Sequence, residues 1–135
     1  DITDLALSRA VRLARDGVYL NELGCVVEAT CRSAGFDVVR DFVGHGIGVE
    51  MHEDPQILNF DSGSPGPRLK TGMVLAIEPM VTAGSGDVRV KRDGWTVVTR
   101  DGKPSAHFEH SIVVREDGGE ILSWCDAPQW GCRSD

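Results

Sequence analysis

The sequence predicts a single domain of the α+β class. Two segments with the 3.6-residue periodicity of amphipathic helices come first, and short strand-like segments separated by turn dipeptides follow them. The chain has 135 residues, of which 41% are hydrophobic, so it can bury one core but hardly two. We therefore expect two helices to pack on one face of a curved, mostly antiparallel sheet.

The two helices are expected at the start of the chain. Residues 3–16 carry apolar side chains broadly on one side, and Gly17 is a typical helix stop. Asn21 is the expected N-cap of the second helix, which Gly35 closes. Because both helices are amphipathic, each needs another element to cover its apolar stripe.

Strands are expected after the second helix. The run GMVLAIEPM is almost continuously apolar, which indicates a buried strand, and Asp-Gly dipeptides separate the later segments. The segment DSGSPGPRLKTG between the helices and these later strands is rich in Gly, Ser and Pro and is expected to be an exposed loop. The predicted strands are residues 36–39, 72–80, 94–100, 106–116 and 119–123.

Composition excludes several functions. Fourteen basic and twenty-one acidic residues give a net charge of −7, which argues against binding to nucleic acid or to an anionic membrane surface. No apolar run approaches the roughly 20 residues that span a bilayer. The opening DITD has no signal-peptide pattern, which favours a cytoplasmic location. The chain starts at Asp1 and not at Met, so we expect it to be a piece of a longer protein.

Four cysteines are present, and none forms a CxxC pair, so a zinc ribbon or thioredoxin-like motif is unsupported. Cys25 and Cys31 should point to different faces of the second helix and cannot easily bridge. Cys125 and Cys132 bracket DAPQWG, where a disulfide is geometrically possible, although reduced thiols are favoured. Residues 125–135 are expected to form an irregular tail.

Two glutamates stand where chemistry could occur. Glu78 ends an apolar run, and Pro79 favours an extended conformation there, so Glu78 finishes a buried strand. Strand alternation places Glu109 on the same face as His107 and Val113. A buried carboxylate is costly unless it is paired or bound to a metal. An Arg or Lys partner, or an exposed strand end, explains each glutamate alone about as well as a functional site does.

Two histidines complete the candidate site. His45 lies in GHGIG, where the glycines are expected to allow positive φ and close approach to a ligand. His52 is a second candidate ligand or a proton donor to substrate. Taken singly, each histidine is explained by a flexible turn or an acidic surface loop. One His and two Glu from separate strand ends suit Mn, Fe, Co or Zn, and no HExxH is present.

Four segments together resemble the type I methionine aminopeptidases: GHGIGVEMHEDP, LKTGMVLAIEPM, DGWTVVTRDGKPSAHFEHSIVV and GEIL. The resemblance runs from about residue 2 to residue 123. Prolidases and aminopeptidase P share the His and Glu pattern, but DGWTV and FEHSIVV point to the methionine enzymes. The resemblance implies that residues 1–124 are the C-terminal half of a pita-bread fold.

The resemblance also implies roles for individual residues in a metal-dependent hydrolase with two divalent ions, of Co, Mn, Fe or Zn. His45 corresponds to the imidazole ligand of one metal. Glu78 corresponds to a ligand of that metal and a candidate proton shuttle, and Glu109 to the carboxylate that bridges both metals. His52 corresponds to the histidine that hydrogen-bonds the substrate and helps stabilise the tetrahedral intermediate.

The implied substrate is the N-terminal methionine of nascent polypeptides, and the ribosome is a further candidate partner. Trp95 resembles the aromatic residue near the pocket for the methionine side chain. Met51 stands where the family often has Phe, so that wall of the pocket is expected to differ.

The family's site needs more than this chain contains. The resemblance implies two aspartate ligands and another catalytic histidine on strands upstream of the first helix, and Asp1 and Asp4 do not replace them. We therefore expect the chain alone to hold at most one metal weakly, to be inactive, and to need an N-terminal half. The alternatives are a non-catalytic pita-bread module that binds peptides or proteins, and a structural domain whose motifs are coincidental.

Overall fold

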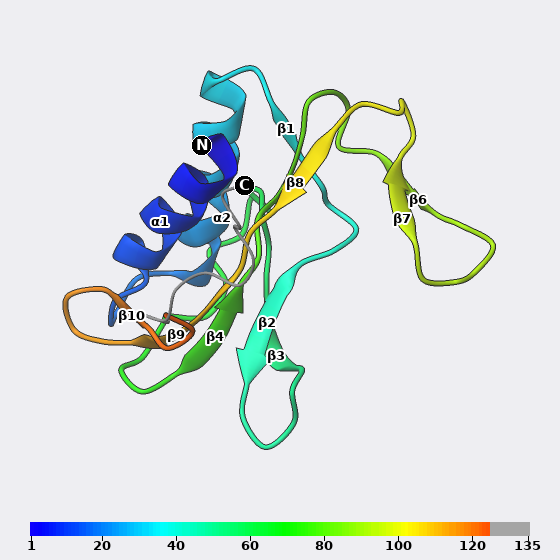
Figure 1. Cartoon of the computed structure of the whole chain (residues 1–135). Helices are drawn as coiled ribbons and strands as arrows, with labels where there is room; N and C mark the ends of the chain where they lie inside the picture. The colour runs from blue at the N-terminus through cyan, green and yellow to red at the C-terminus, as the bar shows by residue number, and fades with distance from the viewer. Residues whose placement is uncertain (125–135) are drawn as a thin grey trace, which may run out of the picture.

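The computed structural model describes residues 1–124, which form two helices packed against antiparallel sheets (Figure 1). Helix α1 spans Ile2–Leu13 and helix α2 spans Leu20–Ser33. The expected α+β class is therefore confirmed. Neither helix is long and apolar enough to cross a membrane. The expected tail and the Cys125–Cys132 pair lie outside the described residues.

The second helix begins earlier than expected. Its N-cap is Tyr19 and not Asn21, and the Tyr19 backbone N–H donates a 2.9 Å hydrogen bond to the Glu22 carboxylate. The Asn21 side chain instead donates to Asp61 across 2.8 Å, which attaches the helix to the loop between β3 and β4. The end of the helix is as expected, because Gly35 follows it with a φ of 81°, in the left-handed region that glycine tolerates.

The strands form three antiparallel sheets. A five-stranded sheet has the order β10-β9-β4-β2-β3, a three-stranded sheet the order β1-β5-β8, and a two-stranded sheet the order β6-β7. The β6–β7 hairpin extends away from the helices, at the right of Figure 1. The bounds are β1 Asp37–Val38, β2 Gly44–Ile47, β3 Glu53–Ile57, β4 Val74–Ile77, β5 Met80–Thr82, β6 Val88–Val90, β7 Val97–Thr99, β8 Ser105–His107, β9 His110–Val114 and β10 Gly119–Ile121.

Two of the predicted strands are each divided in two. Residues 72–80 contain all of β4 and the first residue of β5, and residues 106–116 contain the end of β8 and all of β9. In both cases one part pairs in the five-stranded sheet and the other in the three-stranded sheet. The chain therefore passes between sheets at Glu78-Pro79 and, directly alongside, at Phe108-Glu109.

The core lies between the helices and the sheets. Both helices pack against each other, α1 contacts β4 and β10, and α2 contacts β1 and β3. The large side chains that are almost fully buried come from both layers: Leu7, Leu23, Ile57, Leu69, Leu75, Ile77 and Ile112. Burial raises the pKa of the Cys31 thiol in this core to about 11. Cys25 and Cys31 are free, as expected from their separation on the helix.

Candidate metal centre

Glu78 and Glu109 lie opposite each other at the junction of two sheets. Ile77 pairs with His110 in the five-stranded sheet, and Met80 pairs with His107 in the three-stranded sheet, so the same register continues across the junction. The Phe108 N–H donates to the Pro79 carbonyl oxygen across 3.4 Å and holds the two crossing segments together. Directly opposed residues of an antiparallel pair point to the same face, which brings the two carboxylates close.

His45 reaches this junction from the neighbouring strand. It pairs with Ala76 of β4, two residues before Glu78, and its Nε2 lies 3.3 Å from Glu78 Oε1. Its Nδ1 lies 2.9 Å from the Gly46 carbonyl oxygen. Nδ1 is therefore engaged with the backbone, and Nε2 is the ring nitrogen that faces the carboxylate. An imidazole nitrogen and a carboxylate oxygen that face each other in this way are both possible ligands of a metal ion.

The glycines around His45 serve a different purpose from the one expected. None of Gly44, Gly46 and Gly48 has a positive φ. A Cβ on Gly44 would overlap the Ala76 carbonyl oxygen, and a Cβ on Gly46 would overlap the Asp54 carbonyl oxygen. The glycines therefore let β2 fit closely between β3 and β4, and this fit sets the position of His45.

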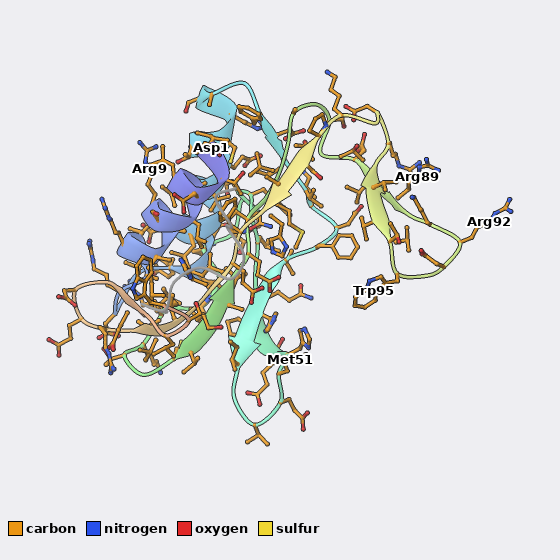
Figure 2. All side chains as sticks on the ribbon, in the orientation of Figure 1. Asp1, Arg9, Met51, Arg89, Arg92 and Trp95 are labelled. Atoms are coloured by element: carbon orange, nitrogen blue, oxygen red, sulfur yellow. The ribbon has the colours of Figure 1, made fainter. Side chains whose placement is uncertain are left out.

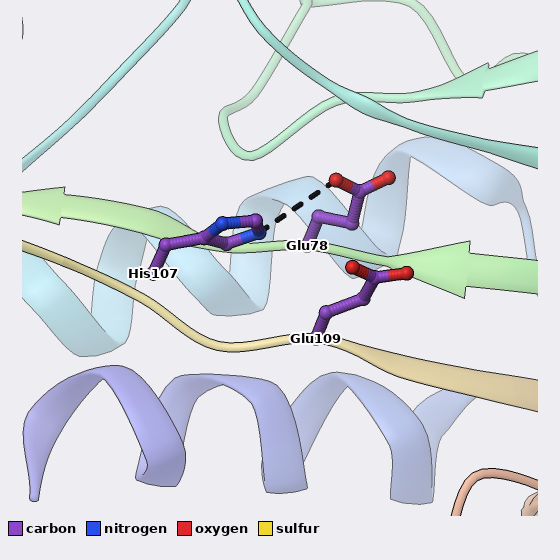
Figure 3. Close-up of side chains that lie close together, drawn as sticks. All are labelled: Glu78, His107 and Glu109. Atoms are coloured by element: carbon purple, nitrogen blue, oxygen red, sulfur yellow. Dashed lines mark ion pairs between the residues drawn. The ribbon is translucent and has the colours of Figure 1, made fainter. Parts of the chain in front are cut away.

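His107 is a second imidazole beside Glu78, to which the sequence interpretation gave no role. Its Nε2 lies 3.6 Å from Glu78 Oε2, as the dashed line in Figure 3 marks. One ligand atom from each of Glu78, His107 and Glu109 lies within 4.8 Å of the others. A hydrogen bond with Glu78 raises the pKa of His107, and partial burial opposes that shift. Strand alternation, which placed His107 on the face of Glu109, was the signal that could have identified it.

The surroundings of Glu78 exclude both alternative explanations for this residue. Within residues 1–124 its ion pairs are with His45 and His107, and no Arg or Lys forms one with it. The Glu78 side chain is only 13% exposed, so it is not a solvated strand end. Its neighbours are instead imidazole nitrogens, which together with carboxylate oxygens are common ligands of divalent first-row metals.

His52 lies beside His45 on the outer side of the centre. The two imidazole ring centroids are 4.3 Å apart with an angle of 49° between the ring planes. Both residues line a surface cavity of about 460 Å³, together with Asp54 and Gln56. The His52 ring is therefore adjacent to the ring of His45, the candidate ligand. It also lines the cavity, where it can reach a bound molecule.

Met51 and Trp95 lie away from this group of side chains. Met51 is in the turn between β2 and β3, and Trp95 is in the β6–β7 hairpin, where Figure 2 shows both side chains on loops that extend from the body of the domain. Their exposed fractions are 71% and 88%. In the described part of the chain neither residue is enclosed in a pocket, so their role in substrate binding stays a prediction.

The arrangement can hold a divalent cation and leave part of its coordination sphere open. Carboxylate oxygens and imidazole nitrogens together suit the divalent first-row metals. An open coordination position allows a metal ion to polarise a carbonyl group or to activate a water molecule. The donors come from adjacent strands, which keeps their spacing fixed.

Comparisons with known proteins agree with this geometry. Residues 1–116 match the family described as metallopeptidase family M24. Methionine aminopeptidase 1 of Bacillus subtilis is 47% identical over 123 residues, which are 91% of this chain and 50% of that protein. Methionine aminopeptidase of Escherichia coli K12 is 46% identical over 122 residues, which are 90% of this chain and 46% of that protein.

The fold is similar to solved structures of the same kind. Methionine aminopeptidase from Thermotoga maritima superimposes with a TM-score of 0.86 and 49% identity, covering 90% of this chain and 49% of that one. Prolidase from Pyrococcus furiosus gives a TM-score of 0.65 at 26% identity, covering 93% of this chain and 31% of that one. The chain thus spans about half the length of the methionine aminopeptidases that it matches.

Proposed function

Because the chain belongs to metallopeptidase family M24, we propose that it forms the C-terminal half of the catalytic domain of a type I methionine aminopeptidase. The proposed reaction is the metal-dependent hydrolysis of the peptide bond after an N-terminal methionine. The observation that carries this proposal is the position of Glu78, opposite Glu109 at the sheet junction and 3.3 Å from the imidazole of His45.

In this proposal His45, Glu78 and Glu109 are the metal ligands that residues 1–124 contribute. Divalent ions bound there supply a polarised substrate carbonyl and a water molecule of lowered pKa. Glu78 accepts a proton from the attacking water and returns it to the nitrogen of the leaving amine. Glu109 would be a further carboxylate ligand, and its charge would offset the positive charge of the bound ions.

His52 donates a hydrogen bond to the carbonyl oxygen of the substrate in this proposal. Its position beside His45 and its exposure to the surface cavity allow it to reach a molecule bound at the centre. The negative charge that develops on that oxygen during attack strengthens the hydrogen bond, which stabilises the tetrahedral intermediate. Met51 and Trp95 contact the methionine side chain from their loops.

The complete site requires residues beyond these 135. The chain spans about half of its relatives, and the resemblance implies two aspartate ligands and one histidine that this sequence does not supply. We propose that the longer protein binds two divalent ions, of Co, Mn, Fe or Zn, whereas this chain alone binds at most one weakly. The substrates are nascent polypeptide N-termini in the cytoplasm, with the ribosome as a further partner.

Methionine release tests this proposal. The 135-residue chain and a longer protein that joins it to an N-terminal half are each incubated with a Met-Gly peptide and Co²⁺ or Mn²⁺. We expect the longer protein to release methionine and the chain alone to release none, because the chain lacks half of the ligands. Release by the chain alone at the rate of the longer protein would contradict the division of the site. An inactive longer protein that still bound peptides would support the non-catalytic alternative.

A further inference from the structure

We propose that Asn59 is a positioning residue of the metal centre, whose side-chain amide holds the Glu78 segment in place beside the segment that carries His45. The sequence interpretation gave Asn59 no role, and the proposed reaction does not use it directly. This inference rests on the proposed function, since it concerns how two of the proposed metal ligands are held.

Asn59 stands out among the buried residues because its side chain is strongly polar. Its exposed fraction is 1%, and the other buried polar residues within residues 1–124 are all threonines. Asparagine is mostly found on protein surfaces, because an amide group buried without hydrogen-bond partners is costly. The position of Asn59 therefore depends on the partners that its amide group finds inside the domain.

The partners of the Asn59 amide nitrogen are two backbone carbonyl oxygens from different parts of the chain. Nδ2 donates to the Glu78 carbonyl oxygen across 3.2 Å and to the Phe42 carbonyl oxygen across 3.4 Å. An asparagine Nδ2 carries two N–H groups, so one is available for each carbonyl. Glu78 directly follows β4, and Phe42 lies two residues before β2 and three before His45. A single side chain thus connects the two segments that carry the proposed ligands.

The connection lies where the pairing between β2 and β4 has ended. The last pair of that ladder toward the junction is His45 with Ala76, so Glu78 lies beyond it. Pro79 has no backbone N–H and cannot donate a hydrogen bond that would extend the ladder. Asn59, which follows β3 by two residues, supplies side-chain N–H groups at this place. Without them, the Glu78 segment would be held to β2 only by the pairs that precede it.

The position of the Glu78 backbone matters because metal ligands have little tolerance in distance. His45 Nε2 and Glu78 Oε1 are 3.3 Å apart, and each must approach the same ion to about 2.0–2.2 Å. A shift of the Glu78 segment along β2 changes this separation directly. Residues that hold metal ligands in place commonly change metal affinity by about 10- to 100-fold when they are replaced. We therefore expect the loss of the Asn59 hydrogen bonds to appear in metal binding and not only in stability.

Asn59→Leu removes both N–H donors and keeps a branched side chain of similar size. In the folded protein, we expect N59L to weaken Co²⁺ binding roughly 10- to 100-fold and to change the visible absorption spectrum of the bound Co²⁺. In the longer protein, kcat for methionine release should fall while KM changes little. Calorimetric titration and absorption spectra are recorded for the 135-residue chain and for the longer protein, after circular dichroism has shown that each variant is folded.

Thr30→Val is the matched control for the loss of a buried hydrogen bond. Thr30 is 3% exposed, and its Oγ1 accepts a 3.1 Å hydrogen bond from Arg9 in the helix layer. T30V therefore removes a buried polar contact away from the sheet junction. It should keep the Co²⁺ affinity and the Co²⁺ spectrum of the wild type.

A measurement on the wild type tests the same inference if N59L does not fold. If the Asn59 hydrogen bonds favour metal binding, a bound metal must strengthen them by the same factor. Saturating Zn²⁺ should therefore slow the hydrogen exchange of the Asn59 side-chain amide protons, followed by NMR. Asn21 is the internal control, because its side-chain amide donates to Asp61 across 2.8 Å on the helix side and should exchange at an unchanged rate.

An N59L protein with the Co²⁺ affinity and spectrum of the wild type would overturn the role given to Asn59. So would a T30V protein weakened as much as N59L, or exchange at Asn59 that Zn²⁺ left unchanged. These results would leave the proposed function intact provided that His45→Gln and Glu109→Gln still weaken metal binding. If those two substitutions changed neither metal binding nor methionine release by the longer protein, the proposed function itself would fail.

Discussion

Glutamine in place of Glu109 is expected to lower methionine release by the longer protein at least roughly 100-fold. The substitution keeps the size of the side chain but removes the negative charge that faces Glu78 across the sheet junction. Two divalent ions held close together need that charge, because their mutual repulsion is offset by the carboxylates between them. The measurement is the rate of methionine release from a Met-Gly peptide at saturating Co²⁺.

Glu116→Gln is the control for this loss. Glu116 is an exposed carboxylate just after β9, so the control makes the same change in net charge away from the centre. It should keep the wild-type rate. Since Glu109 is exposed, E109Q should also unfold at the same urea concentration as the wild type, which separates lost chemistry from lost fold. An E109Q protein as active as E116Q would contradict the role given to Glu109.

Alanine in place of Gly44 is expected to affect both stability and metal binding. A Cβ at this position would overlap the Ala76 carbonyl oxygen and would lie 3.3 Å from the Ile57 Cβ, so β2 is confined from both neighbouring strands. We expect the free energy of unfolding to fall by roughly 1–3 kcal/mol, as for other overpacked interiors. Because His45 is the next residue, the same displacement moves its Nε2 away from Glu78 and weakens metal binding.

Gly48→Ala is the matched control in the same motif. The atoms nearest to a Cβ on Gly48 would be those of the Glu53 carboxylate, the far end of a flexible side chain that can rotate away. The free energy of unfolding of this variant should lie within about 0.5 kcal/mol of the wild-type value, which is the range of ordinary surface substitutions. Urea denaturation and metal titration are measured for both variants. If G44A matched G48A in stability and in metal affinity, the close fit of β2 would not be what positions His45.

Much of the fold could be predicted from local patterns. The amphipathic periodicity of the two helices and the apolar runs of the later strands are properties of the sequence itself, and the structure contains both. Strands β2, β3 and β6 were not predicted, and for β2 and β3 the reason is physical. Strand β2 is half glycine, and β3 contains Pro55, which an edge strand tolerates because its free side needs no N–H donor. Neither strand has the β-branched composition on which sequence interpretation depends.

Local sequence patterns also could not predict that two of the strands are each divided between two sheets. An apolar run shows that a segment is buried, but not that it passes from one sheet to another, because the sheet assignment depends on distant partners. Pro79 was a partial signal, since it interrupts the hydrogen-bonding ladder of the run that contains Glu78. The prediction that Glu78 finishes a strand agrees with the end of β4 at Ile77, but it did not indicate that a second sheet begins at Met80.

Several residues of the candidate site could be identified from the sequence, but their arrangement in space could not. Glu78 and Glu109 were identifiable as carboxylates on strand segments with apolar neighbours, but their opposition required the pairing register. His45 was noticed for its glycines, although the expected positive φ is wrong and the glycines act by allowing close strand packing. His107 was placed on the correct face without a role, because its distance from Glu78 depends on the β5–β8 pairing.

Titration of the metal-free chain with Co²⁺ tests most directly whether the sheet junction is a metal centre. The comparison is between the wild-type chain and Glu78→Gln, since Glu78 is the group that contacts both imidazoles. The account predicts saturable binding of one ion per chain for the wild type and no saturable binding for E78Q. Equal stoichiometry and equal affinity in the two proteins would contradict it.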